Sequence, residues 1–149
     1  MFRKLLTIEE AKTTIQQHFK PKPVGTEQVS LLQATGRILA ENIVSHLNIP
    51  PFDRSIVDGY AVRAEDTFGA EENRPIQLKL VGTINIGELP HVKVTKGKAA
   101  EIATGAPTPP GADAVVMTEH TERTDNAMRI FAPVGKDENI MKASSDIKK

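Results

Sequence analysis

The segment PPFDRSIVDGYAVR, residues 50–63, leads the chain from a proline-rich loop into a strand. Its two prolines keep the backbone extended and cannot donate to a sheet ladder, so the segment is expected to begin in a loop or at a sheet edge. Asp58-Gly59 then marks a sharp bend, where glycine can take a positive φ, and Tyr60 opens an apolar run typical of a strand. Polar side chains therefore gather where a loop meets a strand, a common position for binding and catalytic residues.

Other interpretations of this segment have to be weighed. Taken alone, an Asp-Gly step marks a structural turn more often than a site. A calcium loop beginning at Asp53 is excluded by its register, because Val57 and Ala64 would occupy the fifth and twelfth ligand positions. A magnesium phosphohydrolase that uses Asp53, Asp58 and Asp66 is disfavoured, because no base or nucleophile accompanies these carboxylates.

The composition excludes several classes of function. The 149 residues include 19 Lys or Arg and 19 Asp or Glu, so the chain lacks the net positive charge expected of a nucleic-acid-binding protein. The absence of cysteine excludes disulfides, thiolate metal sites and a cysteine nucleophile. The four histidines are dispersed, and neither a nucleotide-binding glycine loop nor a membrane-spanning apolar run is present. We expect a cytoplasmic protein with no nucleic-acid or membrane partner.

The pattern of apolar residues near the N-terminus predicts one amphipathic helix. Thr7 and Glu10 have the spacing of a capping box, in which each side chain accepts a hydrogen bond from the other residue's backbone N–H. The helix then carries an apolar stripe that needs a partner surface, formed by Ile8, Ala11, Ile15 and Phe19.

Beyond this helix the pattern indicates short strands separated by glycine and proline. The expected strands are 27–32, 60–62, 76–81, 99–102, 114–117 and 128–131. The last two are expected to pair through a polar turn at Asp125-Asn126. The fold class is therefore α+β, mainly β: an irregular lobe of short, bent strands, residues 48–133, inserted into a smaller lobe formed by residues 1–47 with 134–149.

A second polar segment is GKAAEIATGAPTPPGADAVVMTE, residues 97–119. It brings Thr104 to a tight glycine turn, where the Thr104 hydroxyl and the N–H groups of Gly105 and Ala106 could converge on an anion. Taken alone, this stretch too is more often a proline-rich structural turn.

Residues 50–66, 97–119 and the final segment ENIMKASSDIKK, residues 138–149, together resemble the N-terminal region of the molybdopterin molybdenumtransferases. These are the molybdenum insertases of the MoeA and gephyrin E-domain family. The resemblance implies transfer of metal from molybdate into adenylated molybdopterin, with Mg²⁺ as cofactor, at an active site shared across a homodimer. It also implies that the molybdopterin-binding domain is absent here, so that the chain is inactive alone. The alternative is a non-catalytic binding and oligomerisation module.

Three residues match the catalytic positions of the family: Asp58, Thr104 and Asp146. Because a carboxylate repels an incoming oxyanion, Asp58 and Asp146 are expected to hold Mg²⁺ or metal-bound water. Thr104, which is neutral and can donate, is better suited to contact an oxyanion or phosphate. The further candidates for substrate binding are Ser55, Gly105 and Lys142.

The third segment departs from the family pattern in two places. Where the family commonly has Asn-Ile-Arg, this chain has Met141, and the adjacent Lys142 could replace the arginine only as a point charge. Where the family has Gly-Glu before the acid, Ser144 and Ser145 precede Asp146.

Overall fold

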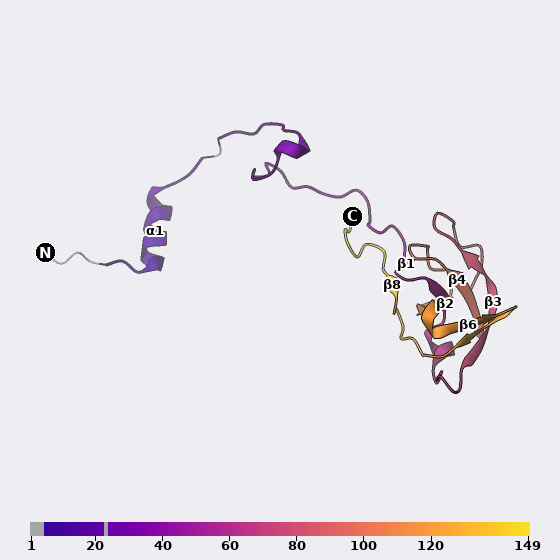
Figure 1. Ribbon diagram of the computed structural model, residues 1–149. Coiled ribbons are helices and arrows are strands. Elements are labelled where there is room, and N and C mark those ends of the chain that lie inside the picture. Colours follow the sequence, from indigo (N-terminus) through magenta and orange to yellow (C-terminus); the bar gives the residue numbers. More distant parts are fainter. Residues whose placement is uncertain (1–4, 23) are drawn as a thin grey trace. The chain divides into compact units, whose positions relative to one another are not determined.

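The computed structural model describes residues 5–22 and 24–149 and divides the chain into two units, Met1–Ile43 and Val44–Lys149. As predicted, these described residues are mainly β with one α-helix (Figure 1). The boundary between the units follows Ile43. The predicted division into residues 48–133 and residues 1–47 with 134–149 stays a prediction.

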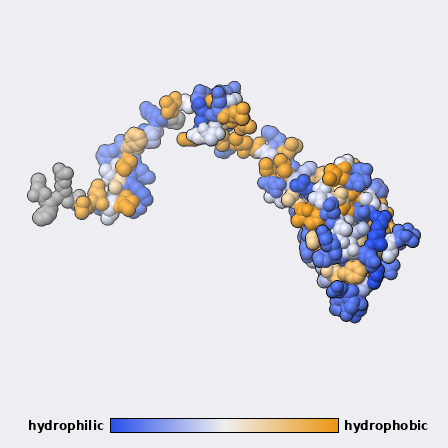
Figure 2. Space-filling view, viewed as in Figure 1, coloured by the Kyte–Doolittle hydropathy of each residue, from blue (hydrophilic) through white to orange (hydrophobic). Residues whose placement is uncertain are grey.

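The first unit contains the predicted helix, α1 (Ile8–His18), and its capping box is confirmed. Thr7 Oγ1 accepts a hydrogen bond from the Glu10 N–H at 3.2 Å, and Glu10 Oε2 accepts from the Thr7 N–H at 2.8 Å. At 11 residues α1 is too short to cross a membrane, and the described part of the chain has no helix that could. Apolar residues lie open on this unit (Figure 2), and none of its described residues is buried.

The strand predicted at 27–32 is wrong. Leu31–Gln33 forms a short 3₁₀ helix, η1, in which the Ala34 N–H donates to the Leu31 carbonyl at 3.2 Å. A strand exists only where a second strand satisfies its ladder, and this unit offers none among its described residues. A short apolar run cannot by itself distinguish the two outcomes.

The second unit is built on a six-stranded sheet in the order β5-β2-β4-β3-β7-β6, in which only β3 and β4 are parallel. The sheet curls (Figure 1), and Arg123 of the edge strand β6 reaches Glu101 of the inner strand β4 at 2.7 Å. Its strands are β2 (Gly59–Val62), β3 (Ile76–Ile84), β4 (Lys98–Ile102), β5 (Ala114–Met117), β6 (Thr121–Thr124) and β7 (Ala127–Ile130).

The predicted pairing of 114–117 with 128–131 is wrong. β5 pairs with β2, whereas β7 lies between β3 and β6. The turn at Asp125-Asn126 does connect two paired strands, but they are β6 and β7. β6 has the sequence Thr-Glu-Arg-Thr, which shows no apolar alternation, and so no strand was predicted there.

Both faces of β2 are covered, because every one of its four residues is buried. Tyr60 and Val62 belong to one apolar cluster, together with Met128 and Ile130. Ala61 belongs to a second cluster on the other face of the strand. A strand buried on both sides reads as a continuous apolar run, as the segment after Gly59 does. The core thereby fixes the position of the loop that precedes β2.

A smaller ribbon pairs β1 (Arg54–Ser55) with β8 (Ile140–Met141), which lie side by side in Figure 1. An isolated bridge between Ile49 and Ile147 extends this antiparallel contact. The first polar segment of the sequence is thus joined directly to the last.

Candidate functional site

The three segments singled out in the sequence meet at β1. On one edge of β1, Arg54 lies opposite Met141 of β8. On the other edge, the Gly105 N–H donates to the Ser55 carbonyl at 2.8 Å, and the Ser55 N–H donates to the Ala106 carbonyl at 3.0 Å. Residues 50–58 therefore run between the turn at residues 104–107 and the C-terminal segment, although neither neighbour is close in sequence.

Asp58 and Thr104 form the best-defined polar contact of this region. Asp58 Oδ1 accepts hydrogen bonds from the Thr104 backbone N–H at 2.7 Å and from the Thr104 hydroxyl at 2.9 Å. The backbone N–H and then the hydroxyl lower the pKa of Asp58 below its usual value. Asp58 is thus an exposed, ionised carboxylate held in one orientation, and in the described structure its Oδ2 makes no hydrogen bond.

Gly59 holds Asp58 in place by close packing and not, as predicted, by a positive φ. A Cβ on Gly59 would lie 2.0 Å from the carbonyl oxygen of Val116 on β5. Only glycine allows the two backbones to approach this closely. Gly59, which was expected to permit a bend, instead permits the close approach of β2 to β5.

Asp58 opens into a hollow of about 210 Å³ at the ends of β2 and β4, here called the Asp58 hollow. Glu101 lies opposite Tyr60 in the register of these strands and supplies a second carboxylate to the hollow. Glu101 accepts hydrogen bonds from the Thr83 hydroxyl at 3.0 Å and from Arg123 at 2.7 Å. The hollow is therefore lined by two ionisable acids and a set of hydroxyl and amide groups.

The turn at Thr104 differs from the anion-binding loop that was expected. The N–H of Thr104 donates to Asp58, that of Gly105 to Ser55, and that of Ala106 to Ala103. All three amides are therefore engaged within the chain. A role for Gly105 in binding substrate stays a prediction, and its backbone N–H does not supply it in this conformation.

Ser55 is only 1% exposed. Its hydroxyl donates to the Val57 carbonyl at 2.5 Å and accepts from the Val57 N–H at 3.2 Å, which closes a turn within the segment. The predicted contact of Ser55 with substrate stays a prediction, and the observed hydroxyl shapes the loop that ends at Asp58.

Lys142 lies between two carboxylates. Its Nζ is 2.6 Å from Asp137 Oδ1 and 3.0 Å from Asp53 Oδ2. Hydrogen bonds to Asp137 and then to Asp53 raise the pKa of Lys142. The charge that was expected to bind substrate is already matched by these neighbours, so that role also stays a prediction.

Asp146 is exposed, and its N–H donates to the Ile49 carbonyl at 2.9 Å. No bond in the described structure joins its carboxylate to Asp58 or Thr104. Within residues 5–22 and 24–149, no three acidic or histidine side chains are grouped as a metal site. Mg²⁺ usually takes one or two carboxylates and completes its shell with water and substrate phosphates. Asp58 fits such a role as a single carboxylate with an open oxygen.

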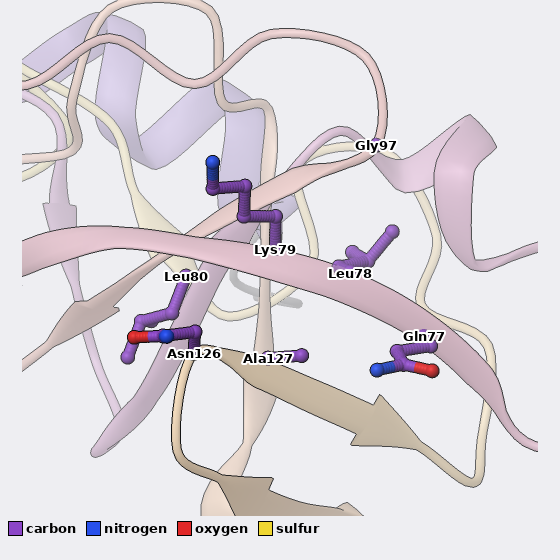
Figure 3. Close-up of a pocket in the computed structure, with 7 residues that line it drawn as sticks. All are labelled: Gln77, Leu78, Lys79, Leu80, Gly97, Asn126 and Ala127. Carbon is purple, nitrogen blue, oxygen red and sulfur yellow. The ribbon is translucent and has the colours of Figure 1, made fainter.

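The Asp58 hollow is not distinguished from other hollows by its volume. A larger hollow, about 670 Å³, follows β3 and includes Gln77, Lys79 and Asn126 (Figure 3). None of the residues predicted for the site lines it. The convergence of the three segments is the stronger indication of function.

Comparison with known families identifies the family of the chain. The family model described as the MoeA N-terminal region, domains I and II, matches residues 6–149. The chain belongs to this family.

Relatives of this MoeA region include named enzymes. The molybdopterin molybdenumtransferase of Staphylococcus epidermidis is 35% identical over 144 residues, which are 96% of this chain and 34% of the relative. That of Synechococcus elongatus is 32% identical over 127 residues, which are 85% of this chain and 32% of the relative. A crystal structure of the molybdopterin biosynthesis moeA protein from Pyrococcus horikoshii OT3 is similar with a TM-score of 0.74 and 46% identity, covering 83% of this chain and 32% of that one. The chain thus spans about a third of the length of these proteins.

Two residues of this region were not assigned to the candidate site in the sequence analysis. Glu101 is the one charged residue within residues 99–102 of β4, and this signal was available in the sequence. Its place in the hollow with Asp58 depends on strand register and could not be predicted. Arg54 is another, since its guanidinium reaches Met141 Sδ at 3.3 Å from the opposite strand. The ribbon therefore retains a guanidinium beside the position where the resemblance led us to expect one.

Proposed function

We propose that this chain is the N-terminal region of a molybdopterin molybdenumtransferase and that Asp58 and Thr104 form its part of an active site shared across a homodimer. The observation that carries the proposal is the double hydrogen bond from Thr104 to one oxygen of Asp58. Two residues matched to catalytic positions, from separate segments, are thereby joined, and Asp58 lines a polar hollow. The molybdenumtransferase names of the relatives support the same reaction class.

In the proposed reaction, metal from molybdate enters adenylated molybdopterin and AMP is released. Both substrates are anionic, so an ionised Asp58 repels them unless a cation or proton lies between. A divalent cation such as Mg²⁺, held by the open oxygen of Asp58, would supply that charge. Thr104 orients Asp58 and keeps it ionised, because its two donors stabilise the charged form.

This assignment changes the role proposed for Thr104. Its hydroxyl proton is directed at Asp58, so Thr104 does not also donate to an oxyanion in the observed conformation. We propose that Thr104 positions the acid and that substrate anions are bound by other groups. Asp146 is proposed as a second acid of the shared site.

The homodimer is proposed on the basis of uncovered apolar surface. The side chains of Ile8, Ile15 and Phe19 on one stripe of α1 are 75%, 60% and 66% exposed. A stripe of this kind needs a partner, because most helical stability comes from packing an apolar face. In the proposal, a second copy of the chain covers this stripe. In the full-length relatives, the two thirds of the protein that this chain does not span could also contribute to that surface.

The test is a hybrid enzyme in which this chain replaces the matching 144 residues of the Staphylococcus epidermidis transferase. Molybdenum incorporation is measured for the hybrid, for Asp58→Asn and for Thr104→Val, with Asp125→Asn in the β6–β7 turn as the matched control. Loss of an oriented acid typically costs about 10²- to 10⁴-fold in turnover, so we expect Asp58→Asn to fall in that range. A hybrid whose Asp58→Ala, Thr104→Ala form stays fully active would favour the non-catalytic binding module instead.

A further inference from the structure

Asp53, directly before β1, is one of the residues that join the three segments of the site. Its backbone carbonyl accepts a hydrogen bond from the Thr108 N–H at 2.9 Å, which connects Asp53 to the second segment, residues 97–119. Its Oδ1 accepts from the Ala143 N–H at 2.8 Å, and its Oδ2 lies 3.0 Å from Lys142 Nζ. One residue of the first segment therefore contacts both of the others, with its backbone on one side and its side chain on the other.

The chain that follows Ala143 runs alongside residues 48–50. The Ser144 N–H donates to the Pro50 carbonyl at 2.9 Å, and the Asp146 N–H donates to the Ile49 carbonyl, also at 2.9 Å. The Ile49 N–H in turn donates to the Ile147 carbonyl at 2.8 Å. The backbone of Asp146 is thus fixed only a few residues beyond the contact with Asp53.

This path is weakly determined by the backbone alone. β1 and β8 are two residues each, and a two-stranded pair is marginally stable in water. Ser144 adopts φ 65°, a left-handed conformation that costs free energy in any residue with a Cβ. A side-chain contact to the segment therefore adds to these backbone hydrogen bonds in keeping residues 142–147 on this course.

The charges around Asp53 suit that purpose. Lys142 is shared between Asp53 and Asp137, so the cation is retained from two sides. The hydrogen bond from Ala143 lowers the pKa of Asp53 most, with Lys142 adding to it, and the acid is ionised at neutral pH. We call Asp53, Asp137 and Lys142 the Asp53 cluster.

We propose that Asp53 is a positioning residue, which through the Asp53 cluster holds residues 142–147 against residues 48–50 and so sets where the Asp146 carboxylate lies. The proposal rests on the proposed function, in which Asp146 is an acid of the shared site. It also gives Lys142 a structural purpose in place of the substrate contact expected from the sequence.

The test is amide hydrogen exchange, followed by NMR, on the 149-residue chain. Asp53→Ala is expected to lower protection at Ser144, Asp146 and Ile147 about tenfold, because the charge-assisted hydrogen bond to Ala143 is lost. Asp53→Asn keeps an acceptor for the Ala143 N–H and is expected to restore most of that protection. Protection at Ala61 and Ala100, within β2 and β4, is expected to stay unchanged.

A matched control is Asp66→Ala. Asp66 Oδ2 accepts from the Gly97 N–H at 2.9 Å, so this variant removes the same kind of bond at another position. It is expected to affect exchange near Gly97 and not at Asp146. The ¹³Cγ resonance of Asp146 provides a second readout, which we expect to shift in Asp53→Ala and not in Asp66→Ala.

Two results would overturn the proposal. Unchanged protection at Asp146 in Asp53→Ala would show that the cluster does not hold the segment. An equal loss at Ala61 and Ala100 would show that Asp53 supports general stability only. Neither readout depends on molybdenum transfer, so failure of this inference is distinguishable from failure of the proposed function, which the Asp58 variants of the hybrid enzyme test.

Discussion

A single oxygen of Asp58 accepts hydrogen bonds from both the backbone N–H and the hydroxyl of Thr104, 46 positions further along the chain. The contact joins a loop that enters β2 with a turn that leaves β4, and these strands are neighbours in the sheet. The orientation of Asp58 is therefore set by a contact between two ends of paired strands and not by its own loop alone. A carboxylate held in this way has a defined charge and direction before any substrate arrives.

The first prediction concerns the ionisation of Asp58. Because both Thr104 donors favour the charged form, Thr104→Val should raise the pKa of Asp58 part of the way to its usual value. The backbone N–H of residue 104 remains as a donor, so the pKa should not return fully. A ¹³C carboxyl titration of the two proteins measures the difference. Thr104→Ser retains a hydroxyl and should titrate like the wild type; an unchanged titration in Thr104→Val would contradict the orientation described.

The second prediction concerns the pH dependence of the Asp53–Lys142 pair. The pKa of Asp53 is lowered in the folded chain, so its contribution is complete above its ordinary pKa and is lost as the pH falls through the lowered one. The pKa of Lys142 is raised, so its contribution is complete below its ordinary pKa and is lost as the pH rises through the raised one. The pair should therefore stabilise the fold throughout the neutral range.

Lys142→Met tests this window by urea unfolding. The two side chains are 49% and 41% exposed, and pairs of this exposure contribute about 0.2–1 kcal/mol at neutral pH. The variant should lose that amount at pH 7, and its difference from the wild type should vanish as the pH falls through the lowered pKa of Asp53. Lys148→Met, which removes a lysine that makes no ion pair within the described residues, provides the control.

The third prediction follows from the backbone at Ser144. Its φ of 65° favours glycine, the residue that the family pattern has at this place. Ser144→Gly should therefore raise the free energy of unfolding by about 1 kcal/mol, as measured by thermal denaturation. Ser145 does not adopt a positive φ, and Ser145→Gly should lower stability slightly because the unfolded chain gains freedom. Stabilisation by both variants alike would point to a cause other than backbone conformation.

What the sequence could and could not predict follows from the range of each interaction. The capping box of α1 depends on residues three apart, and the pattern of four residues was sufficient to predict it. The strands β2 and β5 were predicted because each is an apolar run between turn residues. Their partners were not, because pairing is decided by packing among strands that are far apart in the chain.

The same distinction applies to the site. The segments around Asp58 and Thr104 were found from their residue types, and the structure joins them. The neighbours of Lys142 could not be predicted, because Asp53 reaches it only through the pairing of β1 with β8. The position of Glu101 in the Asp58 hollow could not be predicted either, because it depends on the strand register that places Glu101 opposite Tyr60.

The last prediction concerns Gly59, where a Cβ would lie 2.0 Å from the carbonyl oxygen of Val116. Gly59→Ala must push β2 away from β5, and overpacking of this kind costs about 3 kcal/mol. Gly97→Ala is the matched control, since nothing lies within 4 Å of its Cβ position and only its φ of 74° opposes the change, at about 1 kcal/mol. Urea unfolding should therefore separate the two variants by about 2 kcal/mol.

Because Asp58 precedes Gly59 directly, the Asp58 carboxyl resonance should also shift in Gly59→Ala and remain in place in Gly97→Ala. Equal losses of stability in the two variants would show that the close approach of β2 to β5 does not hold the Asp58 loop.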